Sequence, residues 1–231
     1  MNIQAIGFDL GQTLVFYDKP LNWQTAYSPA IKLVMAACGL SYTPEADKSS
    51  QNILTKYNTR VNLRDYEVSA DTIFTEILSG WQIGLDKLTV AKTAFYSYFM
   101  QGAVCFSDAE HVLRNLKSRE IKTGVLTDVP YGMDNEYALQ DLAPVAKYID
   151  KSLTSNDVGF RKPNIKGYLL LQEAFGVPCN KIAFVGDEEK DVVGANNAGF
   201  ISVLVNRTGR EKSWGQSHSI RELSELLHLI D

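Results

Sequence analysis

The chain has 231 residues, 45% of them hydrophobic, and a formal net charge of −4. This length allows one large domain or a domain with a substantial insertion, and the hydrophobic content is sufficient for a sizeable core. A mildly acidic chain has no overall attraction for nucleic acid or for an anionic membrane, and no apolar run approaches the ~18 residues that cross a bilayer, so we expect neither as a partner.

Short apolar runs that end in polar residues recur along the chain. The first extends from Ile3 to Phe8 and is followed by Asp9. Comparable runs lie at 122–126, 151–154, 181–185 and 200–205. Runs of this length, bounded by turn residues, are typical of buried strands.

Helical patterns separate these runs. One helix is predicted between Pro163 and Gly176, because proline favours the first turn of a helix and glycine favours the position after its end. The last helix is predicted at 220–230, with Ser219 and Glu222 as its capping residues. Strands and helices that alternate with short connections predict an α/β fold with a parallel, doubly wound sheet.

The stretch from 17 to 100 breaks this alternation, because it contains helical patterns and no convincing strand. The helical patterns lie near 24–38, 46–60, 70–79 and 86–99. We therefore predict an all-helical cap formed by residues 17–100, inserted into an α/β core formed by residues 1–16 and 101–231.

Polar residues follow three of the predicted strands: Asp9, Thr127 and Asp187. In an open α/β sheet, ligands bind beyond the carboxyl ends of the strands. Asp191 would lie one helical turn from Asp187 if a helix begins there. Carboxylates that converge at a strand end suit a hard, oxygen-seeking cation such as Mg²⁺.

Each of these residues also has an ordinary structural explanation. Asp9 can be a turn residue, Thr127 a common strand end, and the acids at 187–191 favourable partners of a helix dipole. Lys162, in the segment GFRKP, can be a solvated loop lysine. It is their order along the chain that favours a functional interpretation.

That order resembles the haloacid dehalogenase-like superfamily. The family's first motif is Asp-x-Asp-Gly-Thr at the end of the first strand, and here the segment DLGQT begins at Asp9. The second is a Ser or Thr at the end of a core strand, matched by Thr127. The third is a Lys that often precedes Pro, matched by Lys162. The fourth is Gly-Asp with a second acid nearby, matched by Asp187 and Asp191. The resemblance spans the whole chain, and the predicted cap also resembles that of the subgroup with a cap after the first motif.

The resemblance implies a role for each residue. Asp9 would attack a phosphorus centre and form an aspartyl-phosphate, which divides one difficult displacement into two easier ones. Lys162 would balance charge on the nucleophile and the phosphoryl oxygens, and Thr127 would donate a hydrogen bond to a phosphoryl oxygen. Further contacts to the substrate would come from Gly11, Gln12 and Asp128.

The cofactor implied by the resemblance is Mg²⁺. Its ligands would be Asp9, the carbonyl of Gly11 and Asp187, with Asp191 as a direct or water-mediated partner. A cation is needed because the nucleophile and the phosphoryl group are both anionic.

One position departs from the family pattern. Family phosphatases carry a second Asp two residues after the nucleophile, which protonates the leaving group and then activates water. Here that residue is Gly11, followed by Gln12 in place of the usual Gly. General acid–base assistance typically contributes ~10²–10⁴-fold, so alkyl phosphates should react slowly unless another group supplies the proton.

Several alternatives follow from this departure. Asp18 or Asp128 could replace the missing acid, although each is more simply a loop or cap residue. A cap lysine (Lys32, Lys48 or Lys56) could form the Schiff base that phosphonatase-like members use. Dehalogenase-like members attack carbon without a metal, but the retained Asp187 and Asp191 argue against that chemistry. The chain could also bind a phosphorylated ligand without turning it over.

We therefore expect a magnesium-dependent, phosphatase-like hydrolase that acts on a small phosphorylated metabolite. The N-terminus lacks the positive start and long apolar stretch of a signal peptide. The three cysteines are widely spaced and odd in number, which disfavours a disulfide framework. Both features predict a cytoplasmic protein.

Overall fold

A six-stranded parallel sheet forms the centre of the protein. The computed structural model describes residues 2–18, 22–100 and 102–230. The strand order is β5-β4-β1-β6-β7-β8, and every neighbouring pair is parallel. The strands are β1 (Ala5–Phe8), β4 (Lys122–Thr127), β5 (Lys151–Thr154), β6 (Ile182–Gly186), β7 (Ile201–Val205) and β8 (His218–Ile220). The predicted α/β class and parallel sheet are confirmed.

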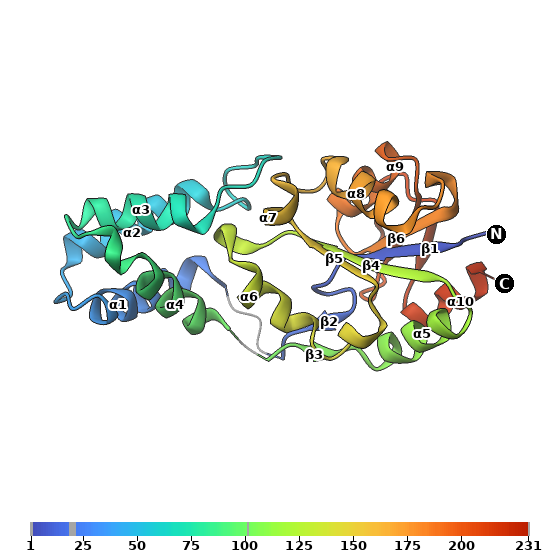
Figure 1. Cartoon of the computed structure of the whole chain (residues 1–231), viewed down its shortest axis with the longest axis horizontal. Helices are drawn as coiled ribbons and strands as arrows, with labels where there is room; N and C mark the ends of the chain where they lie inside the picture. Colours follow the sequence, from blue (N-terminus) through green and yellow to red (C-terminus); the bar gives the residue numbers. More distant parts are fainter. Residues whose placement is uncertain (1, 19–21, 101, 231) are drawn as a thin grey trace.

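Helices cover both faces of the sheet, as a doubly wound fold requires (Figure 1). On one face, α5 (Ser107–Ser118) and α10 (Leu226–Ile230) contribute to a core with the apolar side chains of the central strands. On the other face, α8 (Lys166–Phe175) and α9 (Glu189–Asn197) enclose a second core. Burial on both faces explains why the central strands are continuous apolar runs.

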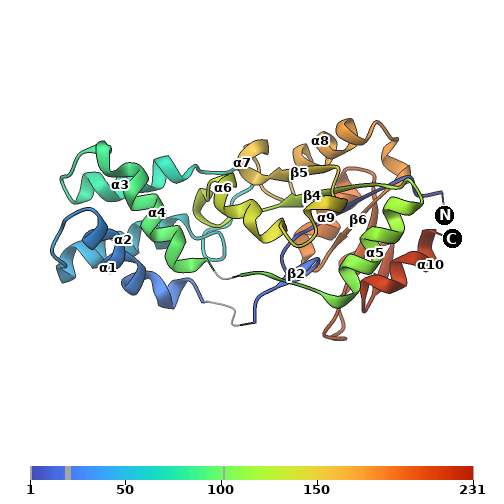
Figure 2. The same ribbon diagram turned by 60° about the horizontal axis from the view of Figure 1, so that its bottom comes forward.

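In the described part of the chain, four helices form a separate group beyond the carboxyl ends of the strands (Figures 1 and 2). They are α1 (Tyr27–Ala37), α2 (Pro44–Tyr57), α3 (Ala70–Gly80) and α4 (Leu88–Phe99). Their aromatic and aliphatic side chains share one core, which also takes in Val129, Tyr131 and Met133 from the segment after β4. Within it, the rings of Trp23 and Phe99 stack with centroids 3.9 Å apart. The predicted cap helices are therefore present, and their core is continuous with residues of the α/β part.

A two-stranded antiparallel ribbon lies where the helical insertion leaves and rejoins the α/β part. It consists of β2 (Val15–Phe16) and β3 (Val104–Cys105). Two-residue strands carry no readable periodicity, which is why the sequence gives no sign of them. The predicted boundaries of cap and core remain a prediction, and residue 101, where the core was expected to resume, lies outside the described residues.

The prediction of one continuous helix at 220–230 is wrong in its first part. Ser219 and Ile220 belong to β8, where Ile220 pairs with Val205 and is buried. When this segment pairs with β7 as the outer strand of the sheet, the side chain of Ile220 becomes buried. That burial is more favourable than beginning the helix at Ser219. The cap is instead Glu222, whose side chain accepts the backbone N–H of Glu225, and Glu225 bonds back in the same way.

Short helices and 3₁₀ turns connect these elements. The short α-helices are α6 (Asn135–Ala138) and α7 (Ser155–Val158), and the 3₁₀ turns are Gln24–Ala26, Leu85–Lys87, Pro130–Gly132, Leu139–Leu142, Ala146–Tyr148, Cys179–Lys181 and Leu223–Glu225. Over the described residues, none of the helices combines the length and apolar character that a membrane crossing needs.

Candidate active site

The register of the three central strands brings the predicted residues together at the carboxyl ends of these strands. Phe8 at the end of β1 pairs with Val125 of β4 on one side and Val185 of β6 on the other. The N–H of Asp9 continues this ladder by donating to the carbonyl of Val185 at 2.8 Å. Asp9, Thr127 and Asp187 therefore emerge side by side. The chain leaves β1 toward β4 and later returns on the other side to β6, so these strand ends form a topological switch point.

Three carboxylates converge at these strand ends. One oxygen from each of Asp9, Asp187 and Asp191 lies within 4.8 Å of the other two. Asp191 is in the first turn of α9, where its Oδ2 accepts the N–H of Glu188 at 3.0 Å. A Cβ on Gly186 would lie 2.4 Å from the Cβ of Asp191. Glycine at 186 is therefore what lets the strand end approach Asp191 so closely.

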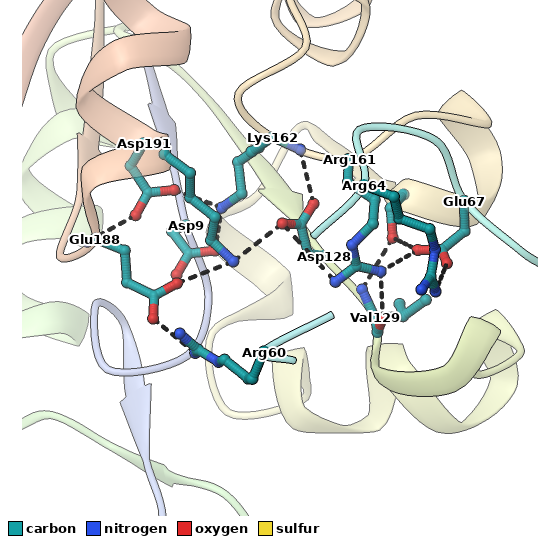
Figure 3. Close-up of polar contacts among 12 residues, drawn as sticks. Asp9, Arg60, Arg64, Glu67, Asp128, Val129, Arg161, Lys162, Glu188 and Asp191 are labelled. Atoms are coloured by element: carbon teal, nitrogen blue, oxygen red, sulfur yellow. Dashed lines mark hydrogen bonds and ion pairs between the residues drawn. The ribbon is translucent and has the colours of Figure 1, made fainter. Parts of the chain in front are cut away.

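Lys162 lies between two of these acids (Figure 3). Its Nζ is 2.6 Å from Asp9 Oδ1 and 2.7 Å from Asp191 Oδ1, and its side chain is only 1% exposed. Burial disfavours the ammonium charge, but the carboxylates of Asp191 and Asp9 outweigh it and hold the pKa of Lys162 well above its usual value. The lysine is therefore a permanent buried cation beside Asp9.

The carboxylates retain more negative charge than one lysine balances. Burial raises the pKa of Asp9 to about 6, against the opposing charge of Lys162. Burial, followed by the charges of Asp9 and Asp191, raises the pKa of Asp187 to about 7. Raised pKa values among neighbouring carboxyl groups are typical of a functional site, and here they indicate a place for a bound cation. Clustered carboxylate oxygens are the donors that Mg²⁺ prefers, so these residues fit that ion.

Most of the other residues expected to contact the substrate line a cavity next to this cluster, and Gln12 is the exception. Its volume is about 280 Å³, and Gly11, Thr127 and Asp128 are among the residues that line it. A Cβ placed on Gly11 would meet no atom within 4 Å, so the position is open space. Gln12 is exposed and has a positive φ of 60°, and its N–H donates to the carbonyl of Val15 at 2.6 Å.

Asp128 is engaged by the protein itself. Its Oδ1 accepts the backbone N–H of Lys162 at 3.0 Å, and its Oδ2 lies 3.0 Å from Lys190 Nζ. Burial opposes its charge, but Lys190, Lys162 and Arg161 outweigh burial and lower the pKa of Asp128. Since it stays ionised, proton donation from it is disfavoured, and its contacts favour a role in holding Lys162. Asp18, the other suggested substitute, is exposed.

The cap lysines expected under phosphonatase chemistry lie elsewhere. Lys56 forms a surface ion pair with Glu76 at 2.9 Å, and Lys32 lies over the ring of Tyr42. Neither they nor Lys48 line the cavity beside Gly11.

The sequence assigns no individual role to several residues of the site. Thr13 donates its hydroxyl to Asp187 Oδ1 at 3.4 Å, and Lys190 pairs with Glu188 at 2.9 Å. From the cap, Arg60 reaches Glu188 at 2.6 Å (Figure 3). Lys190 lies inside the motif from Asp187 to Asp191 and could have been noticed there. Arg60 carries no such signal, because only the fold brings it to the site.

Comparisons with known proteins identify the family of the chain. A family model described as haloacid dehalogenase-like hydrolase matches residues 3–199. A phosphatase of Mycobacterium tuberculosis is 32% identical over 136 residues, which are 59% of this chain and 59% of that protein. A glyceraldehyde 3-phosphate phosphatase of Methanothermobacter thermautotrophicus is 28% identical over 206 residues, 88% of this chain and 86% of that one.

Solved structures share the fold. A 2-haloacid dehalogenase from Pseudomonas syringae pv. Tomato superposes with a TM-score of 0.67 at 19% identity, covering 99% of this chain and 98% of that one. Because the family model matches most of its length, the chain belongs to the haloacid dehalogenase-like hydrolases.

Proposed function

We propose that this phosphatase-like hydrolase removes the phosphoryl group from a small phosphorylated metabolite by way of an aspartyl-phosphate on Asp9. The observation that carries the proposal is the convergence of Asp9, Lys162 and Asp187 at the strand ends, beside a cavity lined by Thr127. The similarity to two proteins named as phosphatases supports a phosphoryl substrate.

Asp9 is suited to act as the nucleophile. Its Oδ1 is held by Lys162 at 2.6 Å, which fixes the carboxylate and favours its ionised form. In the first step, a carboxylate oxygen of Asp9 bonds to phosphorus while the bond from phosphorus to the leaving oxygen breaks. In the second, water attacks phosphorus and the bond from phosphorus to the Asp9 oxygen breaks, which releases inorganic phosphate and regenerates the Asp9 carboxylate.

The metal expected for this chemistry is Mg²⁺. Asp9, Asp187 and the carbonyl of Gly11 would hold it, with Asp191 directly or through water. When bound, the ion supplies positive charge against the repulsion between the carboxylates and the phosphoryl oxygens. Thr127 would donate its hydroxyl to a phosphoryl oxygen from the neighbouring strand end, and Lys162 would keep its charge beside the reacting atoms.

Beryllium fluoride tests the nucleophile directly, because with Mg²⁺ it mimics a phosphoryl group on an ionised carboxylate. We expect a protein-bound fluorine resonance in the native protein that is lost in Asp9→Asn. Asp187→Asn keeps the nucleophile and should weaken adduct formation by weakening Mg²⁺ binding. A native protein that binds Mg²⁺ by calorimetry and forms no adduct would instead support a phosphate-binding protein without phosphoryl transfer.

A substrate screen distinguishes the remaining chemistries. Sugar phosphates, acyl phosphates, phosphonates and 2-haloacids should be offered with and without Mg²⁺. We expect turnover of phosphates that depends on Mg²⁺. Metal-independent release of halide would contradict the proposal and favour attack on carbon.

A further inference from the structure

The open space in front of Gly11 lies in a cavity that contains another acid. In family phosphatases the side chain at this position is a carboxylate, whereas here a Cβ on Gly11 would meet nothing within 4 Å. The cavity of about 280 Å³ that Gly11 lines has Asp141 and Tyr17 in its wall, together with Thr127. Asp141 belongs to the 3₁₀ turn Leu139–Leu142, and Tyr17 follows β2. Neither belongs to a motif of the sequence.

The two side chains form a hydrogen-bonded pair. The hydroxyl of Tyr17 donates to Oδ2 of Asp141 in a short contact, and both residues are partly buried. Apolar side chains share the cavity with the pair, since Trp23, Phe99 and Met133 also line it. A carboxyl group that shares a hydrogen bond in such a setting is suited to hold and release a proton.

We propose that Tyr17 and Asp141 together replace the missing acid at Gly11 by transferring a proton between the cavity and the reacting oxygens. The inference rests on the proposed function, since it concerns the leaving group of the same phosphoryl transfer. Tyr17 is the group that faces the leaving oxygen, and Asp141 positions it and is the source of the proton.

The proton balance closes over the two steps. The first step starts from a protonated Asp141 carboxyl, in which the hydrogen bond is reversed and the carboxyl donates to the Tyr17 oxygen. As Asp9 bonds to phosphorus and the leaving oxygen departs, Tyr17 gives its proton to that oxygen and takes the proton of the Asp141 carboxyl. The products are a neutral alcohol, the aspartyl-phosphate and an Asp141 carboxylate. When water then attacks phosphorus, Tyr17 takes a proton from the water and passes its own to Asp141. The second step releases inorganic phosphate and restores both residues.

The electrostatics of the pair agree with this role. Burial raises the pKa of Asp141, against the hydrogen bond from Tyr17, so that the carboxyl holds a proton more readily than a solvated one. Burial, the hydrogen bond to Asp141 and the charge of Asp141 raise the pKa of Tyr17, with a further contribution from Asp9. The tyrosine therefore keeps a proton on its hydroxyl at the start of each step.

The dependence on the leaving group tests the inference. Phenyl phosphate needs a proton on its leaving oxygen, whereas 2,4-dinitrophenyl phosphate leaves without one. For Tyr17→Phe and for Asp141→Asn, we expect kcat/KM for phenyl phosphate to fall ~10²-fold or more, with little change for the dinitrophenyl ester. Gly11→Asp, added to Tyr17→Phe, should restore much of the loss, because the open space accepts a carboxylate.

Tyr148→Phe is the matched control. Tyr148 also donates to a carboxylate, Glu110 at 3.0 Å, but it does not line the cavity. It should leave both substrates unaffected. Equal losses on both substrates would indicate a structural role for Tyr17 and overturn the inference, as would no loss on either. If Tyr17→Phe does not fold, Asp141→Asn provides the same comparison.

Failure of the inference is distinguishable from failure of the proposed function. If the native protein forms the beryllofluoride adduct and cleaves both esters, while the variants match it, the function stands and the inference falls. If the native protein forms no adduct and cleaves neither ester, both fall together.

Discussion

Gln12 is held in a backbone conformation that suits glycine better. Its φ of 60° lies in the left-handed region, where a Cβ costs roughly 1–2 kcal/mol. The backbone N–H of Gln12 donates a hydrogen bond to the carbonyl of Val15. The loop that follows Asp9 therefore holds Gln12 in this conformation. Gln12→Gly should therefore raise the free energy of unfolding by ~1 kcal/mol. Urea denaturation would measure this as a higher midpoint concentration with an unchanged m-value.

Two other glutamines provide the control for this prediction. Gln82 also has a positive φ, of 59°, so Gln82→Gly should stabilise in the same way. Gln51 lies within α2, where glycine costs ~1 kcal/mol and should destabilise. A loss of stability in Gln12→Gly would show that its side chain makes a contact that outweighs the backbone strain.

At the scale of elements, the cap is attached to the loop that carries Lys162. The cap segment 65–67 pairs with 159–161 through a bridge between Tyr66 and Phe160. The N–H of Glu67 donates to the carbonyl of Gly159 at 3.0 Å, and the N–H of Arg161 donates to that of Asp65 at 2.8 Å. The position of Lys162 therefore depends on the cap as well as on the sheet.

A buried ion pair reinforces this attachment. The carboxylate of Glu67 accepts hydrogen bonds from Arg161 and from Ser155, and it lies 3.7 Å from Arg64. The side chain of Glu67 is 3% exposed and that of Arg161 is 8% exposed. Glu67→Gln removes the charge that compensates the buried guanidinium groups, and it should lower the free energy of unfolding by ~3 kcal/mol. Because Arg161 precedes Lys162, turnover should fall as well.

Arg60→Gln is the contrasting variant. Arg60 also joins cap to core, at 2.6 Å from Glu188, but its side chain is 77% exposed. Exposed pairs contribute at most ~1 kcal/mol, so this variant should be nearly neutral in the same denaturation experiment. Equal effects of the two substitutions would contradict the view that burial makes the Glu67 pair important.

The sequence predicts the regular elements better than the contacts between them. The strand beginning near Ala5 follows from an apolar run, and the end of α8 just before Gly176 follows from that glycine. β2 could not be found, because its two residues are defined only by pairing with Cys105 and Val104. Ile220 appeared helical because an apolar residue at a sheet edge and one on a helix face give the same local pattern.

The candidate site likewise contains residues that the sequence can identify and residues that only the folded structure brings together. Asp9 and Asp187 follow strands, so topology alone brings them together, and sequence reasoning can identify them. Tyr17 and Asp141 are 124 residues apart, one just after β2 and the other in a short 3₁₀ turn. Their contact is a result of tertiary packing, which no local pattern encodes.

For the whole molecule, the acidic cluster links stability to pH and to Mg²⁺. An unfolded aspartate titrates near 3.9, whereas burial raises the pKa of Asp9 to about 6 and that of Asp187 to about 7 in the fold. Between these values the folded state binds more protons than the unfolded state. The free energy of unfolding of the metal-free protein should therefore fall as pH rises from about 4 to about 7.

Mg²⁺ should reverse this loss, because it binds the ionised carboxylates of the folded state only. Urea unfolding at about pH 5 and about pH 8, with and without saturating Mg²⁺, separates the metal effect from other titrating groups. We expect a large stabilisation by Mg²⁺ at the higher pH and little at the lower, where protons compete. Asp187→Asn should make the metal-free protein more stable at the higher pH, since it removes a repelled charge, and should lose most of the response to Mg²⁺. A response that is the same at both pH values, or unchanged in Asp187→Asn, would show that Mg²⁺ binds elsewhere, and the assignment of the three carboxylates would be wrong.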